Sequence, residues 1–470
     1  MTSVLKKETL LYGLGRLFGS SISFFLLPFY THTLSSTGEY GVVQIIVAFI
    51  AFSNIVFLFG FDGALMKYYV ASRNDLDKKA YLSNTYLWVF VFGFFILLML
   101  ISIREPLSNY IIAGYDSSLV PKIAFILFFD ALRSIHLLVL RAENRSIHFT
   151  IVMVLDILLL SSFNVFFVGI KGLGVAGVVH ANFLSSIILF LLTLSVIITR
   201  FSYKTLSFKR WNTLRMFAFP LMPAGLFWMI LEFADRKMLE FLIPNDSLHI
   251  VGIYGAGYKL GSLMLLLVYA FNYAWRPFFL KKNNIQSLKK ISAYFFFGLG
   301  LFYILLVLFV DVIATMNIPF IGTSLIDNRY WEGLVIVPAI ALAYIFHGSF
   351  VLQEAEPFIT NNVYKISVCR ALGVIINISL NFLFIPYFEK PYLGASLATL
   401  IAYFLMSLIL YFWNYKSSIF RYDSLMVLFV ATNIFAAWLL STYGTFFFKL
   451  LFPFTYTLQF KYYTKWRLTN

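Results

Sequence analysis

Long apolar segments recur along the whole chain, separated by short polar connections. An α-helix needs about 20 apolar residues to cross the hydrocarbon core of a bilayer, and these segments have roughly that length. The pattern therefore predicts an all-α integral membrane protein with about fourteen transmembrane helices. We place them at residues 9–31, 41–61, 81–103, 119–140, 148–170, 175–199, 216–243, 250–280, 291–315, 332–352, 363–386, 393–415, 424–440 and 445–460.

The positive charges predict how these helices are oriented. One set of alternate connections, together with both termini, holds 22 of the 36 Lys and Arg residues, whereas the opposite set holds 6. The excess of Lys and Arg marks the cytoplasmic side of a membrane protein. Both termini and the basic connection at 200–215 are therefore expected in the cytoplasm. The basic residues of the predicted cytoplasmic face account for most of the net charge of +15, so we predict no nucleic-acid partner.

The composition agrees with a chain that resides in the membrane, since 61% of the residues are hydrophobic, 12% are charged and the mean hydropathy is +0.85. Cys369 is the single cysteine, which excludes an intramolecular disulfide and a cysteine metal cluster. The N-terminal segment has no cleavage-like pattern, so the first helix is expected to stay in the protein.

The chain contains no motif typical of an enzyme. A phosphate-binding glycine loop, a His/Glu metal pair at helical spacing and a nucleophile elbow are all missing from the sequence. The longest connections, at 200–215 and 315–331, are too short for a catalytic domain. We therefore predict a protein that is not an enzyme and has no metal or other cofactor, while an ion or proton gradient stays open as the source of energy.

Two motifs repeat at a constant offset. Asn164-Val-Phe-Phe-Val-Gly followed by Gly177 matches Asn381-Phe-Leu-Phe-Ile-Pro followed by Gly394, and each pair is 217 residues apart. Because six predicted helices separate the copies, the two halves should have the same orientation, in a pseudo-twofold arrangement about the membrane normal. We predict a first six-helix lobe at 1–205, a second six-helix lobe at 206–418 and an additional C-terminal helix pair at 419–470.

Three groups of motifs resemble those of bacterial polysaccharide exporters. They lie in the first hairpin, in the seventh and eighth spans, and in the eleventh and twelfth spans: Gly15-Arg-Leu-Phe-Gly with Gly38-Glu-Tyr-Gly-Val-Val-Gln, Phe219-Pro-Leu-Met-Pro-Ala-Gly-Leu with Val251-Gly-Ile-Tyr-Gly-Ala-Gly-Tyr-Lys-Leu, and Asn377-Ile-Ser-Leu-Asn-Phe-Leu-Phe-Ile-Pro with Leu393-Gly-Ala-Ser-Leu-Ala-Thr-Leu. Their order and spacing resemble the polysaccharide (O-antigen and capsule repeat-unit) flippase family of the multidrug/oligosaccharidyl-lipid/polysaccharide exporter superfamily.

This resemblance implies a function and a location. It implies a flippase in the bacterial cytoplasmic (inner) membrane that moves undecaprenyl-diphosphate-linked oligosaccharide repeat units to the outer leaflet by alternating access, for O-antigen or capsule biosynthesis. The implied partners are this lipid-linked glycan, the membrane lipids, and polysaccharide polymerase and assembly proteins.

Charged residues within the predicted spans are the candidate site. An Arg or Lys at the bilayer midplane costs roughly 2.5–3.5 kcal/mol on insertion scales, so its presence indicates a role. A cationic cavity would suit a diphosphate head group. The basic candidates for substrate binding are Arg16, Arg236, Lys259, Arg276 and Arg370. The candidates for a charge network or gate are Asp130, Arg133, Asp156, Glu232, Asp235 and Lys237.

Helical spacing predicts partners for these charges. Asp130 and Arg133 are three residues apart and can form an ion pair, with Asp156 as a third member. Glu232 lies four residues before Arg236, which would leave Asp235 to meet Lys259 on the next span. Either arrangement fits a structural network between helices as well as a gate or coupling site.

Other polar residues of the spans have structural interpretations. The asparagines are expected to tie helices together. The histidines are expected to hydrogen-bond a neighbour, with proton coupling as the alternative. The prolines can bend the seventh span, either as a fixed kink or as a point about which the span rocks. These residues are His136, His180, His347, Asn164, Asn377, Asn381, Pro220 and Pro223.

Two other functions stay open at this point. A multidrug or cation antiporter of the same superfamily would share the architecture, although the excess of basic candidates weighs against a cationic cargo. A non-transporting scaffold of polysaccharide assembly would tolerate neutralisation of the embedded charges.

Overall fold

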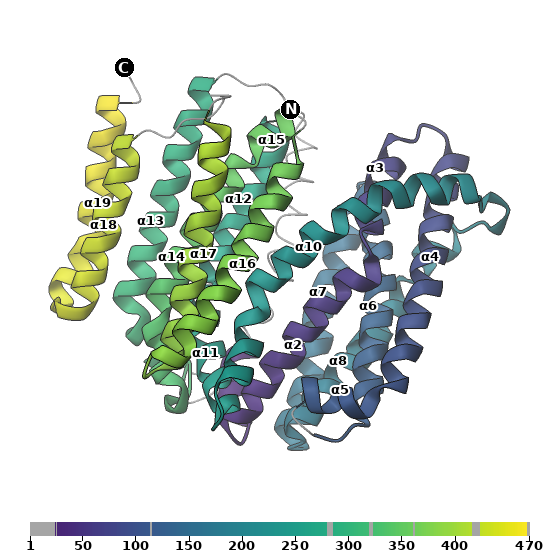
Figure 1. The fold of residues 1–470 in the computed structure, drawn as a ribbon, viewed down its shortest axis with the longest axis horizontal. Coiled ribbons are helices and arrows are strands. Elements are labelled where there is room, and N and C mark those ends of the chain that lie inside the picture. Colours follow the sequence, from purple (N-terminus) through teal and green to yellow (C-terminus); the bar gives the residue numbers. More distant parts are fainter. Residues whose placement is uncertain are drawn as a thin grey trace. The chain divides into compact units, whose positions relative to one another are not determined.

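The computed structural model describes residues 24, 26–112, 115–279, 285–318, 323–360, 362–415 and 424–467. Nearly all of this part of the chain is helical (Figure 1). Its strands are the two-residue segments β1 (Asn317–Ile318) and β2 (Thr323–Ser324), which pair antiparallel. Long helices satisfy every backbone hydrogen bond within the segment, which the water-free interior of a membrane requires. The prediction of an all-α membrane fold is confirmed.

The number of spans is only partly tested. Among the described residues, 11 helices are long and apolar enough to cross a membrane, or 12 if one bent pair forms a single span. The first predicted span lies mostly outside the described residues. The last, α19 (Phe446–Arg467), is a helix but is not one of the qualifying segments. The count of fourteen therefore stays a prediction.

The chain falls into two compact units, Met1–Lys237 and Met238–Asn470. The first unit packs around α6, which contacts α2, α4 and α8 and buries 61% of its most apolar stretch. In contrast, residues 146–170, which include α7, bury only 11% of their own most apolar stretch and offer apolar side chains to lipid. The described elements of this unit are α2 (Thr37–Leu58), α3 (Phe61–Ala71), α4 (Asp75–Ser102), α5 (Arg104–Ile111), α6 (Leu119–Ala142), α7 (Ser146–Asn164), η1 (Val165–Ile170), α8 (Gly174–Thr193), α9 (Ser195–Ile198), η2 (Tyr203–Thr205) and most of α10 (Phe208–Leu242).

The seventh predicted span, α10, packs closely on the α2–α3 segment. A Cβ atom at Gly60 would lie 2.3 Å from the carbonyl oxygen of Ala218, and the φ of Gly60 is +77°, so only glycine fits there. A Cβ atom at Gly225 would approach the side chain of Ile55 to 3.2 Å. Helix α10 continues through both of its internal prolines. The first compact unit therefore extends past the lobe boundary that we predict at residue 205.

The second unit packs around α14. Residues 328–359, which include α14, form one span that buries 67% of its most apolar stretch, and α14 contacts α11, α12, α13 and α17. The C-terminal helices α18 and α19 run side by side next to α13 (Figure 1). The remaining elements are α11 (Ser247–Gly261), α12 (Leu263–Phe279), α13 (Ile285–Thr315), η3 (Asn328–Ile336), α14 (Val337–Gln353), α15 (Ala355–Ile359), α16 (Tyr364–Tyr387), α17 (Pro391–Asn414) and α18 (Ser424–Tyr443).

The sequence repeat corresponds to a repeated packing contact. In the first unit, a Cβ atom at Gly177 would lie 2.9 Å from the carbonyl oxygen of Phe167. In the second unit, a Cβ atom at Gly394 would lie 2.6 Å from the carbonyl oxygen of Phe384. The two phenylalanines are separated by the same 217 residues as the two glycines. Gly177 lets α8 approach the end of the span before it, and Gly394 lets α17 approach the end of α16. The repeat is therefore one of structure as well as of sequence.

Two spans depart from a straight α-helix. The fifth continues from α7 into η1, a π-helical segment in which the Lys171 amide donates to the Phe166 carbonyl at 2.9 Å. The eighth is broken at Ser262, where α11 and α12 meet at 43°. Neither departure was predicted, because the high mean hydropathy of both segments indicates only that they can span the membrane.

Candidate functional site

Arg133 is shared by two carboxylates inside the first unit. Its Nη1 atom lies 2.7 Å from Oδ2 of Asp156 on α7, and its Nη2 atom lies 3.2 Å from Oδ1 of Asp130. The Ser186 hydroxyl on α8 also donates to Asp130 at 2.9 Å. Asp130 and Arg133 thus form the pair that helical spacing predicts, Asp156 joins them from the next span, and the contacts connect α6, α7 and α8. The role of these residues as a network or gate stays a prediction. Two acids against one base leave one formal negative charge within the spans.

Four charged residues of α10 lie within two turns of each other. Arg236 is buried, its Nη1 atom donates to the Glu232 carbonyl at 2.7 Å, and its guanidinium lies over the Phe233 ring at 5.0 Å. Asp235 is fully buried. Lys237 donates to the Tyr110 carbonyl, and its Nζ atom lies 3.9 Å from the centre of the Tyr110 ring. These contacts connect α10 to α5. The roles of these residues, and the approach of Asp235 to Lys259, stay predictions.

In the second unit, Arg370 has an acidic partner. Its Nη2 atom lies 2.9 Å from Oε1 of Glu354, whose side chain is 3% exposed. This contact joins α16 to the turn between α14 and α15. Because Glu354 compensates its charge, Arg370 is less available to a free anion than the sequence alone indicates.

The other basic candidates are less fully described. Lys259 lies half-buried in the last turn of α11. Arg276 lies in α12, but its side chain falls outside the described part, and Arg16 lies outside the described residues altogether.

Sequence reasoning missed two buried acids, Glu354 and Glu356. Glu356 is 1% exposed, and within the described residues neither of its carboxylate oxygens has a hydrogen-bond partner. Glu354 and Glu356 both follow the tenth predicted span, so their carboxylates were assigned to a polar connection between helices. The signal that was available is the continuation of apolar residues through Ala355, Pro357 and Phe358, which extends the span to residue 359.

A second network, at the end of the first unit that we predict to be cytoplasmic, centres on Glu143. Arg200 binds it in a bidentate manner, from Nε to Oε1 at 2.6 Å and from Nη2 to Oε2 at 2.7 Å, and the Tyr69 hydroxyl donates at 2.8 Å. Burial is the largest single influence on the pKa of Glu143 and raises it. The bonds from Arg200 and Tyr69, with the nearby Arg145, outweigh burial and hold this pKa below its ordinary value. The charged form of Glu143 therefore stabilises the fold.

The polar residues of the spans connect helices as expected. His136 bonds to Thr193 at 2.8 Å, and the Tyr30 hydroxyl donates to Asn164 at 2.8 Å. In the second unit Asn377 donates to Thr399 on α17 at 3.3 Å. His180 contacts Lys122 at 2.9 Å, which was not predicted. These contacts link neighbouring helices, whereas Asn381 donates to Asn377 within α16 at 3.1 Å.

Comparison of the whole fold with solved structures indicates a class. A lipid II flippase MurJ in an inward closed conformation matches with a TM-score of 0.76 and 16% identity, over 98% of this chain and 100% of that one. A multidrug resistance MATE family transporter in an inward-facing conformation matches with a TM-score of 0.67 and 12% identity, over 84% and 94%. A mutant of the Vibrio cholerae MATE transporter VcmN matches with a TM-score of 0.55 and 16% identity, over 89% and 99%. The chain therefore has the fold that these flippase and MATE transporter structures share.

Comparison of the sequence indicates the family. The polysaccharide biosynthesis protein family matches residues 5–283, more than half of the chain. Comparison with curated protein sequences returns no significant match. The chain belongs to the polysaccharide biosynthesis protein family, as its motifs predict.

Proposed function

We propose that the protein is a flippase for undecaprenyl-diphosphate-linked oligosaccharide repeat units, which it moves from the cytoplasmic to the outer leaflet of the cytoplasmic membrane for O-antigen or capsule biosynthesis. The family match over residues 5–283 carries this proposal, because it links the chain to polysaccharide synthesis. The fold similarity to a lipid II flippase supports a lipid-linked cargo. Alternating access through a cationic central cavity is part of the proposal.

The embedded charges support an anionic cargo. A diphosphate requires cationic donors in a setting where unpaired polar groups are costly, and arginine supplies a planar fork that matches its oxygens. Arg16, Arg236, Lys259 and Arg276 are the proposed contacts. Arg370 is a weaker member of this set, since Glu354 already binds it. An ion or proton gradient would supply the energy for net movement.

The alternative is a multidrug or cation antiporter. The fold similarity to MATE transporters favours it as the second candidate. Its cargo would be cationic, and cations are repelled by the basic residues that we place at the site. The nature of the cargo therefore separates the two functions.

Deletion of the gene tests the proposal directly. In the deletion strain we expect loss of one surface polysaccharide, with the lipid-linked repeat unit still synthesised and retained in the inner leaflet. Loss of drug resistance with normal surface glycan would instead establish the antiporter. Unchanged glycan and unchanged resistance, in a strain with no second flippase, would remove both functions. Restoring the deletion strain with the wild-type protein in the presence of an ionophore tests the gradient.

Substitution of Arg236 tests the cationic cavity and gives the first prediction. Arg236→Ala should abolish export while the folded protein remains, and Arg236→Lys should restore part of it, because Lys keeps the charge but not the bidentate fork. Arg104→Ala is the matched control, since this arginine is 55% exposed on α5. Export and folded abundance are measured in the same cells.

A purely structural Arg236 gives a different result. Loss of the charge would then lower folded abundance, and the double change Arg236→Gln with Glu232→Gln would restore abundance and export together. Wild-type export from both Arg16→Ala and Arg236→Ala would overturn the cationic cavity without affecting the assignment of a lipid-linked cargo.

A further inference from the structure

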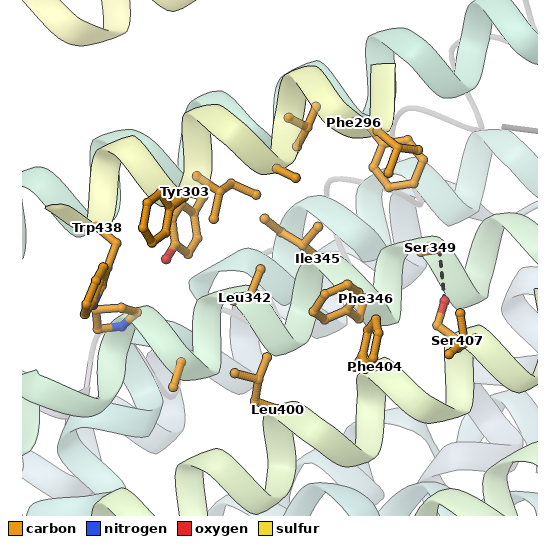
Figure 2. A pocket seen from close by; sticks show the side chains of 18 of the residues that line it. Phe296, Tyr303, Leu342, Ile345, Phe346, Ser349, Leu400, Phe404, Ser407 and Trp438 are labelled. Carbon is orange, nitrogen blue, oxygen red and sulfur yellow. Dashed lines mark hydrogen bonds between the residues drawn. The ribbon is translucent and has the colours of Figure 1, made fainter. Parts of the chain in front are cut away.

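A long cavity of about 860 Å³ lies within the second unit, between α13, α14, α17 and α18. Figure 2 shows apolar and aromatic side chains along most of its length, among them Tyr303, Phe346, Phe404 and Trp438, and a hydrogen-bonded pair of serines at one end. Its lining follows α14 from Pro338 to Gln353, a distance of about 22 Å at roughly 1.5 Å per residue. The volume lies in the range of roughly 300–1,000 Å³ that is typical of ligand pockets.

The environment of the cavity limits what can fill it. All four lining helices provide candidate membrane spans, so the medium around them is hydrocarbon. The space is open along part of its length, where Phe404 is 40% and Trp438 46% exposed, so surrounding lipid can enter it. Its apolar lining offers water too few hydrogen bonds. A hydrocarbon chain satisfies the lining and is the molecule that surrounds it. The length of the cavity fits an extended chain better than a compact molecule.

The position of α18 explains why the space exists. The C-terminal helix pair packs against the second unit at α13, which contacts both α18 and α19. The cavity lies where α18 faces α14 and α17, and residues from Val427 to Trp438 on α18 line it. An occupant would therefore fill the gap between the C-terminal pair and the core of the second unit.

One end of the cavity is polar. Gln353 donates from Nε2 to the hydroxyls of Ser349 and Ser407 at 3.1 and 3.0 Å, and Ser407 donates to Ser349 at 2.9 Å. Gln353 is 3% exposed, and within the described residues its Oε1 atom has no hydrogen-bond partner. This end lies where α14 finishes, on the side that the basic residues predict to be cytoplasmic. A buried acceptor at the mouth of an apolar cavity suits an amphiphile with a donor in its polar part.

We propose that this cavity binds the acyl chain of a phospholipid from the cytoplasmic leaflet, with the polar end at Gln353 and the chain extending along α14 towards Trp438. The lipid fills the gap beneath α18 and holds the C-terminal helix pair against the second unit. This role is independent of the cargo that the protein transports.

The proposal can be tested by photo-crosslinking the full-length protein in nanodiscs. A phosphatidylethanolamine probe with a diazirine on its acyl chain should label peptides from α14, α17 and α18 that line the cavity. Ala431→Trp places a large ring into the lining and should reduce this labelling at least fivefold. Thr432→Trp is the matched control, because Thr432 is the next residue of α18, is exposed and does not line the cavity. Gln353→Leu should reduce labelling while the protein still elutes as a folded species.

Two results would overturn the proposal. One is folded wild-type protein with no label on the lining peptides, or with label that Ala431→Trp and Thr432→Trp reduce equally. The other is preferential labelling by a diazirine-bearing polyprenyl phosphate that displaces the phospholipid probe, which would assign the cavity to a polyprenyl tail.

Discussion

Arg133 is a base that two carboxylates share. It balances Asp130 and Asp156 at the same time, at 3.2 and 2.7 Å. We predict that Arg133→Gln destabilises the protein by about 3–5 kcal/mol, since it leaves two uncompensated carboxylates in the spans. Asp130→Asn should cost much less, because Arg133 and Asp156 then form a neutral pair. Folded protein is measured by size-exclusion chromatography of a fluorescent fusion.

The control for this prediction is Arg104→Gln, which removes an arginine that is 55% exposed and should leave folded abundance unchanged. Equal abundance of Arg133→Gln and wild type would contradict the structural interpretation. The triad would then be a candidate for coupling rather than for support.

Glu143 provides a prediction for acid stability. Its ordinary pKa is 4.5, and in the folded protein the pKa is lower, so its contribution is fully present above pH 4.5 and is lost as pH falls through the folded value. At about pH 7, Glu143→Gln should lower the unfolding free energy by about 1–2 kcal/mol, because it breaks the bidentate bond to Arg200. The difference from wild type should shrink as the pH is lowered below 4.5.

Thermal unfolding in detergent, followed at several pH values, measures this difference. Glu105→Gln serves as control, because Glu105 is 69% exposed and its contact with Arg104 is 3.4 Å. A gap between Glu143→Gln and wild type that stays constant down to strongly acid pH would show that the ionised carboxylate is not the source of the stability.

The sequence predicts side-chain partners only where the two residues lie on the same helix. Asp130 and Arg133 are found because they are one helical turn apart. Arg200 and Glu143 are 57 residues apart, so no local rule joins them. Glu354 was not predicted as a buried acid for another reason. It follows the apolar core of its span, and only the tertiary structure shows that α15 stays buried.

At the scale of helices, glycines set how closely two elements approach. A Cβ atom at Gly257 on α11 would lie 2.0 Å from the carbonyl oxygen of Gly333 on η3, and one at Gly333 would lie 2.3 Å from that of Ile253. Backbone atoms cannot move aside as a side-chain end can. We predict that Gly257→Ala lowers the unfolding free energy by about 1–3 kcal/mol through overpacking.

Gly298 on α13 provides the matched control, because a Cβ atom there would have no atom within 4 Å. Gly298→Ala should be neutral or slightly stabilising, since alanine favours the helix over the unfolded chain. The two variants are compared by their thermal midpoints in the same detergent. Equal midpoints would refute the close approach of α11 and η3.

Helix positions follow well from the apolar pattern, and helix ends and breaks do not. The predicted span at 393–415 corresponds to α17 (Pro391–Asn414), and that at 363–386 to α16 (Tyr364–Tyr387). The bend at Ser262 follows a Gly261–Ser262 pair, at which helices can kink, but mean hydropathy does not detect it. Bends and windings depend on the neighbours of a helix, which a pattern of apolar residues does not contain.

For the whole molecule, the charge distribution gives a prediction of topology. Both termini and the 200–215 connection should face the cytoplasm. Cysteine labelling tests this after replacement of Cys369, which is buried. A cysteine at residue 205 should react in inverted vesicles and stay protected in intact cells, and one at residue 390, on the opposite side, should show the reverse. Efficient labelling of residue 205 in intact cells would overturn the orientation.

The class and family of the molecule were within reach of the sequence, because motifs such as that around Phe219 and that around Asn377 lie in the right order. The identity of the cargo was not, since it depends on how side chains such as Arg236 and Lys259 are arranged in space, and spacing along the chain does not determine this arrangement. The family match places the chain in the polysaccharide biosynthesis protein family, and its fold is similar to that of a lipid II flippase.

The π-helical segment η1 has a counterpart in the other unit. Its residues, Val165–Ile170, correspond through the offset of 217 to 382–387, which end the α-helix α16. The offset is the same before and after this stretch, at Asn164 and at Gly177, so no residue has been inserted or deleted. Two corresponding segments of equal length are therefore π-helical in one unit and α-helical in the other. Because a π turn holds more residues than an α turn, the side chains at the end of the fifth span face other directions than their counterparts at the end of α16.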